Sequence, residues 1–351
     1  MAKKKGRRVE PAKYAPGKEA EVQSIAMPAA FLNIRIHDLK TTPSLSGLCV
    51  GYEKEAWRTP QLVDHMMEWM PEFALKYSEL DGITAATSVP LLRQAAKTVY
   101  KSEKFKNRGE FGELLLHIAV RQVFRSLPAI SKLYYKSARN DTVKGFDAVH
   151  VVGPVEDLEL WLGEAKLYDN IARAIRDVAE ELKKHTDSDY LRDEFMLIKG
   201  KIDPKLPHAA ALKVLLDHNR SLDAVFKRVA IPVLLTYDSD CVAAHKECGA
   251  AYEKMFAEEI EKNYKTFAAS ALPKEVRIHL FLLPLKSKKE LIAALDAKLK
   301  TWQNLPSAGS GSAARPTSAS TISSCASWTR RPRPRPPPAS GRLRGRSPRR
   351  P

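Results

Sequence analysis

The alternation of apolar and polar positions is clearest in two neighbouring segments near the middle of the chain. The segment from Leu158 to Lys166 alternates with period two, with leucines at 158, 160 and 162, which is typical of a half-buried strand. The segment from Asp147 to Val151 alternates in the same way, and the turn-forming pair Gly153-Pro154 separates the two. The pattern predicts an antiparallel hairpin, with Asp147 and Glu164 at the same end of adjacent strands.

Charged residues continue one face of this predicted hairpin. Glu164 and Lys166 extend the leucine-bearing face of the second segment, and Asp147 shares that face if it is the core one. Neighbouring strands lie roughly 5 Å apart, so the two carboxylates could share one divalent ion. Charges on a strand more commonly belong to a solvated face or an edge. Two close carboxylates beside a core, however, repel each other and lose hydration unless a cation joins them, so the pattern indicates a site of chemistry.

Helical periodicity flanks the predicted hairpin. Residues 109–124 form a predicted amphipathic helix with Glu113 near its start. Two interpretations of Glu113 remain open: a charge favoured by the helix dipole, or a group that reaches a metal site through a water. Residues 132–136 are predicted to form a first strand, and the apolar stripe from Ile171 to Leu182 predicts a helix after the hairpin.

The same patterns predict the rest of the fold. The remaining elements are a strand at 31–36, helices at 60–76 and 89–100, strands at 229–236 and 276–283, and helices at 247–267 and 287–302. Pro232 predicts that the first of the two later strands is an edge or bulged strand. The second has the near-continuous apolar character of a central strand. Together the elements predict an α/β fold whose central mixed sheet is flanked by helices.

The basic charge of the chain lies mainly at its ends. We divide the chain into an arm at 1–22, an N-terminal α+β region at 23–104 that is a candidate partner-binding region, a second domain at 105–305 and a tail at 306–351. The tail holds ten arginines and no acid, and the arm holds seven basic and three acidic residues, which leaves +3 of the net +17 for the 283 residues between them. Composition predicts that both ends are disordered. Cationic ends bind any polyanion, so by themselves they are weak evidence that the protein binds DNA.

Composition also narrows the class of protein. No run approaches 18 consecutive apolar residues, no signal-peptide pattern is present, and four cysteines are too few for a disulfide scaffold. We therefore expect a cytoplasmic protein with no membrane partner. No Gly-x-x-x-x-Gly-Lys phosphate-binding loop occurs, so any helicase activity has to come from another polypeptide.

Three runs of the sequence resemble one family. Gly112–Leu116, Val143–His150 and Leu160–Tyr168 are together similar to the HamA family, the nuclease subunits of a bacterial anti-phage defence system called Hachiman. The resemblance is most specific over residues 105–185, and the order of elements extends it to about residue 300. A proline often precedes the first aspartate in the wider superfamily, and Phe146 stands there in this chain.

The resemblance implies a fold, a cofactor and partners. The implied fold is the restriction-endonuclease-like fold of the PD-(D/E)xK superfamily, which would make residues 105–305 a nuclease domain. The implied cofactor is Mg²⁺, for which Mn²⁺ can substitute, and the implied partners are DNA and a helicase subunit, HamB. The implied site residues are Asp147, Glu164 and the backbone carbonyl of Ala165 as metal ligands, with Lys166 and Glu113 as further catalytic groups.

Two functions of different classes follow. The first is a Mg²⁺-dependent deoxyribonuclease that hydrolyses phosphodiester bonds when a helicase partner releases or activates it. The alternative is a non-catalytic DNA-binding or regulatory subunit of a helicase complex. The presence of Asp147, Glu164 and Lys166 favours the first, because a pure scaffold has no physical need for buried carboxylates.

Overall fold

The structure is a computed structural model of the 351-residue chain. It describes residues 27–81, 83–99, 109–131 and 145–305. Three predicted segments lie outside the described residues, namely the arm at 1–22, the strand at 132–136 and the tail at 306–351. The described residues all belong to one structural unit, and no helix among them is long and apolar enough to cross a membrane.

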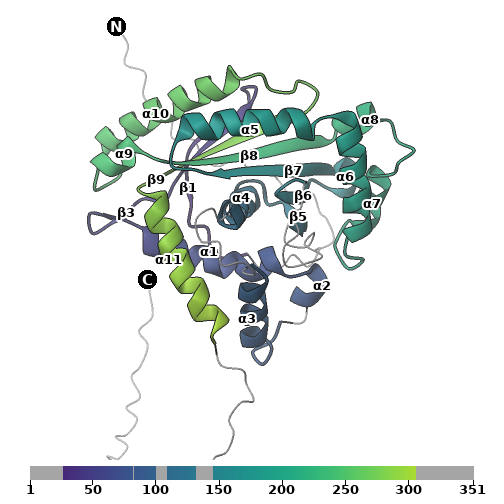
Figure 1. The fold of residues 1–351 in the computed structure, drawn as a ribbon, viewed down its shortest axis with the longest axis horizontal. Helices are drawn as coiled ribbons and strands as arrows, with labels where there is room; N and C mark the ends of the chain where they lie inside the picture. The colour runs from purple at the N-terminus through teal and green to yellow at the C-terminus, as the bar shows by residue number, and fades with distance from the viewer. Residues whose placement is uncertain (1–26, 82, 100–108, 132–144, 306–351) are drawn as a thin grey trace, which may run out of the picture. The chain divides into compact units, whose positions relative to one another are not determined.

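A mixed sheet of seven strands forms the centre of the described residues, with the order β1-β2-β9-β8-β7-β6-β5 (Figure 1). The strand bounds are β1 Asn33–Asp38, β2 Ser44–Cys49, β5 Leu127–Ser131, β6 Ala148–Val152, β7 Glu159–Leu167, β8 Val229–Asp238 and β9 Arg277–Leu285. Strands β2, β9, β8 and β7 run parallel, whereas β1, β6 and β5 pair antiparallel with their neighbours. The predicted α/β fold with a mixed central sheet is confirmed.

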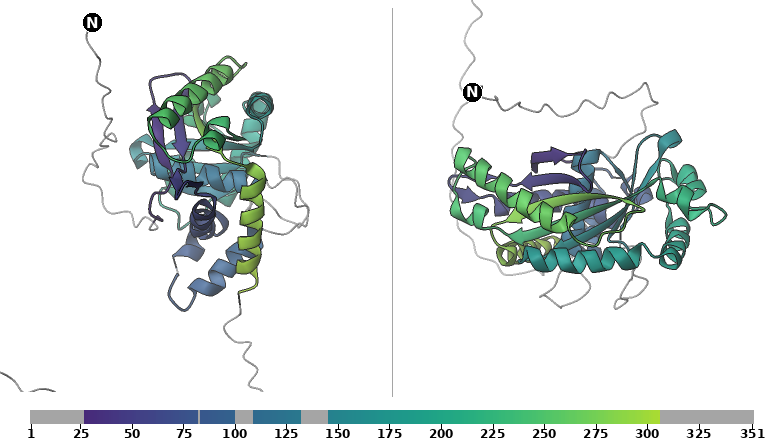
Figure 2. Two further views of the ribbon diagram at one scale, coloured as in Figure 1. Left: turned by 90° about the vertical axis from the view of Figure 1, so that its left-hand side faces the viewer. Right: turned by 90° about the horizontal axis from the view of Figure 1, so that it is seen from above.

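Helices cover both faces of this sheet. Helices α5 and α10 lie over one face, and α4, α1, α3 and α11 lie on the other, as the views in Figure 1 and Figure 2 agree. The helix bounds are α1 Thr59–Ala74, α2 Tyr77–Leu80, α3 Ser88–Val99, α4 Gly109–Phe124, α5 Ile171–His185, α6 Ser188–Lys201, α7 Ala209–Leu215, α8 Leu222–Phe226, α9 Asp240–Ala244, α10 Ala250–Ala268 and α11 Lys288–Gln303. A short ribbon, β3 Tyr52–Glu53 with β4 Ala56–Trp57, and a 3₁₀ helix at Val155–Asp157 complete the described elements.

The predicted hairpin and the helix before it are confirmed. Strands β6 and β7 pair antiparallel, from Ala148 opposite Gly163 to Val152 opposite Glu159. Gly153 begins the turn with φ +91°, a backbone conformation that glycine adopts without a steric penalty. The predicted helix at 109–124 is α4, with the same bounds.

The prediction that Pro232 marks an edge or bulged strand is wrong. Strand β8 lies inside the sheet, between β7 and β9, and is buried along nearly its whole length. The pairing between β7 and β8 runs to Trp161 opposite Ala230 and resumes at Glu164 opposite Val233. The proline, which has no N–H to donate, stands in this interval, so the rest of the ladder keeps its register around it.

The predicted N-terminal region contributes to the same sheet as the predicted nuclease domain. Strand β2 pairs in parallel with β9, from Ser44 opposite His279 to Gly47 opposite Leu282. One continuous cluster of buried apolar residues also includes side chains from both regions. The division at residue 104 therefore stays a prediction about function, while the sheet itself is shared.

Small residues set the packing of α4 against β7. A Cβ on Gly163 would meet Leu116 Cδ2 at 2.6 Å, and a Cβ on Gly112 would meet Leu167 Cβ at 3.1 Å. Helix α4 thus covers the odd-numbered face of β7, at a distance that a larger residue at position 163 would prevent. The even-numbered face of the strand, which carries Glu164, is left to α5.

Candidate functional site

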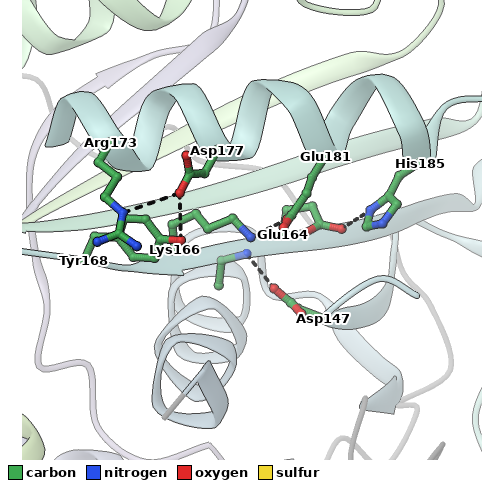
Figure 3. A network of polar contacts seen from close by, with 9 residues as sticks. Asp147, Glu164, Lys166, Tyr168, Arg173, Asp177, Glu181 and His185 are labelled. Carbon is green, nitrogen blue, oxygen red and sulfur yellow. Dashed lines mark hydrogen bonds and ion pairs between the residues drawn. The ribbon is translucent and has the colours of Figure 1, made fainter. Parts of the chain in front are cut away.

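The site lies where the β6–β7 hairpin meets helix α5 (Figure 3). Asp147 comes just before β6, and Glu164 and Lys166 lie on β7. The Asp147 carboxylate accepts a hydrogen bond from the backbone N–H of Ala165, with 2.8 Å between Oδ2 and N. The structure thus brings Asp147 to the strand that carries the other two predicted residues.

The side chains of Glu164 and Lys166 point toward α5, as period-two alternation predicts (Figure 3). Asp147 departs from that alternation. Its backbone N–H donates to the carbonyl of Gly163 at 2.8 Å, although Gly163 already pairs with Ala148. In Figure 3 the Asp147 carboxylate lies below β7 and reaches its backbone, while the two β7 side chains rise above the strand. The shared face that the sequence predicts for the two carboxylates is not the observed arrangement, because the regular ladder ends at Ala148.

Glu164 is a buried carboxyl group that contacts His185 and is repelled by the like charge of Asp147. Its Oε1 lies 2.5 Å from Nδ1 of His185, and only 1% of the residue is exposed. Burial, followed by the nearby charge of Asp147, raises the pKa of Glu164 to about 7, while His185 and Lys166 act in the opposite direction. Asp147 Oδ2 is hydrogen-bonded to the N–H of Ala165, the residue that follows Glu164, so the two carboxylates are neighbours at this point of β7.

Lys166 forms an ion pair with Glu181 of α5. Burial on its own would lower the pKa of Lys166, but the hydrogen bond to Glu181 and the charge of Glu164 raise it. The ammonium group therefore stays charged at neutral pH, and its position depends on α5.

His185 was not identified from the sequence. Its ring stacks on Tyr190 with 4.8 Å between ring centres and meets the edge or face of Phe146 at 5.1 Å. Burial would lower the pKa of His185, but the hydrogen bond to Glu164 and the surrounding carboxylates raise it. The available signal was spacing: Glu181 and His185 are four residues apart and so lie on one face of the helix.

Glu113 is buried on α4 with 7% of the residue exposed. Its helix packs against the odd-numbered face of β7, opposite to the face that carries Glu164 and Lys166. Its assignment as a catalytic group stays a prediction.

Asp147 and Glu164 are the carboxylates at this site that could bind a divalent metal ion. Among the described residues no group of three His, Cys, Asp or Glu side chains is placed to hold a metal. A site here would rest on two carboxylates, Asp147 and Glu164, with the Ala165 carbonyl, water and substrate oxygens as the other ligands. Mg²⁺ is commonly bound in this way, through one or two carboxylates and several waters. The raised pKa of Glu164 beside Asp147 is also what a cation would relieve, so the residues fit such an ion.

The part of the chain that contains this site is similar to known proteins. The chain is similar to Anti-bacteriophage protein A of Escherichia coli (strain K12), with 25% identity over 274 residues, which cover 71% of this chain and 46% of the relative. The chain therefore spans about half the length of the curated relative that it matches. No solved structure matches it. The model of the HamA family matches residues 29–299, which include the hairpin, α4 and α5, and the chain therefore belongs to the HamA family.

Proposed function

We propose that this chain is a metal-dependent DNA nuclease that acts in defence against bacteriophage. One observation carries the proposal: the Asp147 carboxylate accepts a hydrogen bond at 2.8 Å from the N–H of Ala165, the residue of β7 that stands between the buried Glu164 and Lys166. Burying such a group of charges has a large desolvation penalty, which a bound cation would offset. The group matches the Asp…Glu-x-Lys pattern of metal-dependent phosphodiesterases, and a curated relative is named for anti-bacteriophage action.

Each residue has a distinct role in this proposal. Asp147, Glu164 and the carbonyl of Ala165 hold Mg²⁺, or Mn²⁺ in its place. The ion, when bound, polarises the phosphodiester and lowers the pKa of an attacking water. The Lys166 ammonium stabilises negative charge that develops at the phosphate. Glu181 keeps that ammonium beside the strand.

The proposed nuclease works with a helicase partner. The sequence holds no phosphate-binding loop of the Walker type, so strand separation by ATP hydrolysis requires another chain. The resemblance to HamA implies that this partner is the helicase subunit HamB. A nuclease that can cut its host's DNA has to be restrained, and we propose that the partner restrains it until invading DNA is encountered.

Plasmid cleavage tests the proposal. The full chain, alone and with its helicase partner, is incubated with supercoiled DNA in Mg²⁺ and in EDTA. We expect nicking that requires Mg²⁺ and is lost in Glu164→Ala and Lys166→Ala, while both variants still bind DNA in a filter-binding titration. An intact complex that never nicks DNA under triggering conditions contradicts the proposal.

A regulatory, non-catalytic subunit is the second candidate. One observation favours it: Glu164 and Lys166 are already engaged by His185 and Glu181. In that case the substitutions at Glu164 and Lys166 change DNA binding or partner binding and leave no nicking activity to lose.

A further inference from the structure

Strand β7 and helix α5 are joined by three side-chain contacts in a row (Figure 3). Glu164 contacts His185 at 2.5 Å, Lys166 pairs with Glu181, and the hydroxyl of Tyr168 donates to Asp177 Oδ2 at 3.0 Å. Each step is two residues forward on the strand and four residues back on the helix. We call this set of six residues the β7–α5 ladder.

The two spacings match because of elementary geometry. Two residues of a strand advance roughly 6.7 Å, and four residues of an α-helix advance about 6 Å. Alternate strand residues share one face, and helix residues four apart share another. A helix that runs antiparallel to the strand can therefore place one partner opposite each even-numbered residue.

From this ladder we infer that His185 and Glu181 are positioning residues of the candidate site: His185 orients the Glu164 carboxylate toward a divalent metal, and Glu181 holds the Lys166 ammonium. The inference rests on the proposed function. It assigns a task to two α5 residues that lie outside the Asp…Glu-x-Lys pattern.

The surroundings of His185 support this role. Tyr190 of α6 stacks on its ring with an interplanar angle of 10°, and Phe146 packs against it at 62°. The ring is thus held on two sides, so Nδ1 meets one oxygen of Glu164 in a fixed direction. A carboxylate ligand that is itself hydrogen-bonded presents its other oxygen to a metal with less loss of rotational freedom. Phe146 also directly precedes Asp147, so the same aromatic contact joins the two metal-binding segments.

The Lys166 side chain needs an anchor for a different reason. Its ammonium group ends a flexible four-carbon chain. A cation stabilises a phosphate less when its side chain moves among several rotamers. Glu181 remains 38% exposed in its side chain, so it can hold the ammonium without sealing it from solvent.

The packing of α5 does not depend on the ladder. The buried residues of α5 are Ala174, Ile175, Val178, Ala179 and Leu182, a stripe distinct from the ladder residues. Removing one polar contact of the ladder should therefore leave α5 in place. The role of that contact can then be tested in a protein that still folds.

Metal binding by the full chain tests the role of His185. Isothermal titration with Mn²⁺ alone is carried out on the unaltered chain, His185→Leu, His185→Asn and Glu180→Ala. We expect His185→Leu to weaken Mn²⁺ binding by about 10- to 100-fold. His185→Asn keeps an amide nitrogen near the position of Nδ1 and should recover most of the affinity. Glu180 is exposed on α5 beside Glu181, so Glu180→Ala should change the affinity by no more than about twofold.

The outcomes separate this inference from the proposed function. If Glu164→Ala abolishes Mn²⁺ binding but His185→Leu leaves it unchanged or strengthens it, the positioning role is wrong while the metal site stands. A failure of His185→Asn to restore affinity also overturns it. If Glu164→Ala leaves Mn²⁺ binding intact, the proposed metal site itself fails. Thermal melts of each variant confirm that folding is retained.

Steady-state cleavage tests the role of Glu181. At saturating Mg²⁺ we expect Glu181→Ala to lower kcat for plasmid nicking by about tenfold with little change in KM for DNA. Glu181→Gln keeps an oxygen acceptor for the ammonium and should recover part of the rate. Equal kcat in Glu181→Ala and Glu180→Ala overturns the anchoring role.

Discussion

Two buried glutamates of this protein are held in opposite ways. Glu72 of α1 lies 2.5 Å from Arg121 Nε and 3.5 Å from His117 Nε2, and its pKa is lowered: burial would raise it, but these two partners outweigh burial. Glu164 is more deeply buried, and there burial and the charge of Asp147 raise the pKa to about 7. The first carboxylate is neutralised within the fold. The second carries a charge that the fold leaves partly uncompensated, which is what a site for a cation requires.

The largest expected effect concerns catalysis at Glu164. Glu164→Gln keeps the size of the side chain but removes the charge that holds the metal. We expect plasmid nicking to fall by at least about 10³-fold, which corresponds to roughly 4 kcal/mol of transition-state stabilisation. Glu72→Gln, measured at a temperature where the variant is folded, should keep its cleavage rate. Comparable losses in the two variants would remove the distinction between a structural and a functional glutamate.

The next effect concerns stability at the other site. Arg121→Met leaves the charge of Glu72 buried without its nearest cation, and we expect a loss of about 3–5 kcal/mol in the free energy of unfolding. Urea denaturation measures it. The double variant Arg121→Met with Glu72→Gln should regain part of the loss, since no charge is then stranded. A single variant as stable as the unaltered chain would show that the pair does not stabilise the fold.

The two glutamates should also respond to pH with opposite sign. The folded pKa of Glu164, about 7, lies above its ordinary value of 4.5, so its contribution to stability is full below pH 4.5 and is lost as pH rises toward 7. In metal-free buffer, Glu164→Gln should therefore gain stability relative to the unaltered chain over this window, by up to about 3 kcal/mol. Glu72, whose folded pKa is lowered, stabilises the fold above pH 4.5 and loses that contribution as pH falls. Urea titrations at several pH values measure both, and a flat difference for Glu164→Gln contradicts the assignment.

The smallest expected effect is the change in thermal stability when Mg²⁺ binds. A ligand that binds only the folded state at 10 to 100 times its Kd stabilises it by about 1.4–2.7 kcal/mol. We expect Mg²⁺ to raise the Tm of the unaltered chain and of Glu72→Gln, but not that of Glu164→Gln, in differential scanning fluorimetry. Li⁺ at matched ionic strength controls for general salt effects. An equal rise in all three proteins would place the ion elsewhere.

Much of the fold was predictable because it depends on local pattern. The period-two alternation gave the β6–β7 hairpin, and the helical stripes gave α4 and α5. Helices α6 to α8 were not predicted: α7 and α8 are only seven and five residues long, whereas α6 carries Leu191, Phe195 and Ile198 at helical spacing, a signal that was overlooked. Pro232 was misjudged because a proline lacks only one N–H, and neighbouring pairs of the ladder compensate for it.

The sequence by itself determined that Glu164 and Lys166 share a face of one strand, since side-chain direction along an extended backbone follows from local torsions. Only the tertiary structure decided that α5 covers this face and places His185 against Glu164, 21 residues further along the chain. It also decided that Asp147 leaves the regular ladder and that α4, the helix of Glu113, packs on the opposite face of β7. These arrangements depend on which elements pack together, and packing is set by contacts between residues distant in sequence, which no local pattern records.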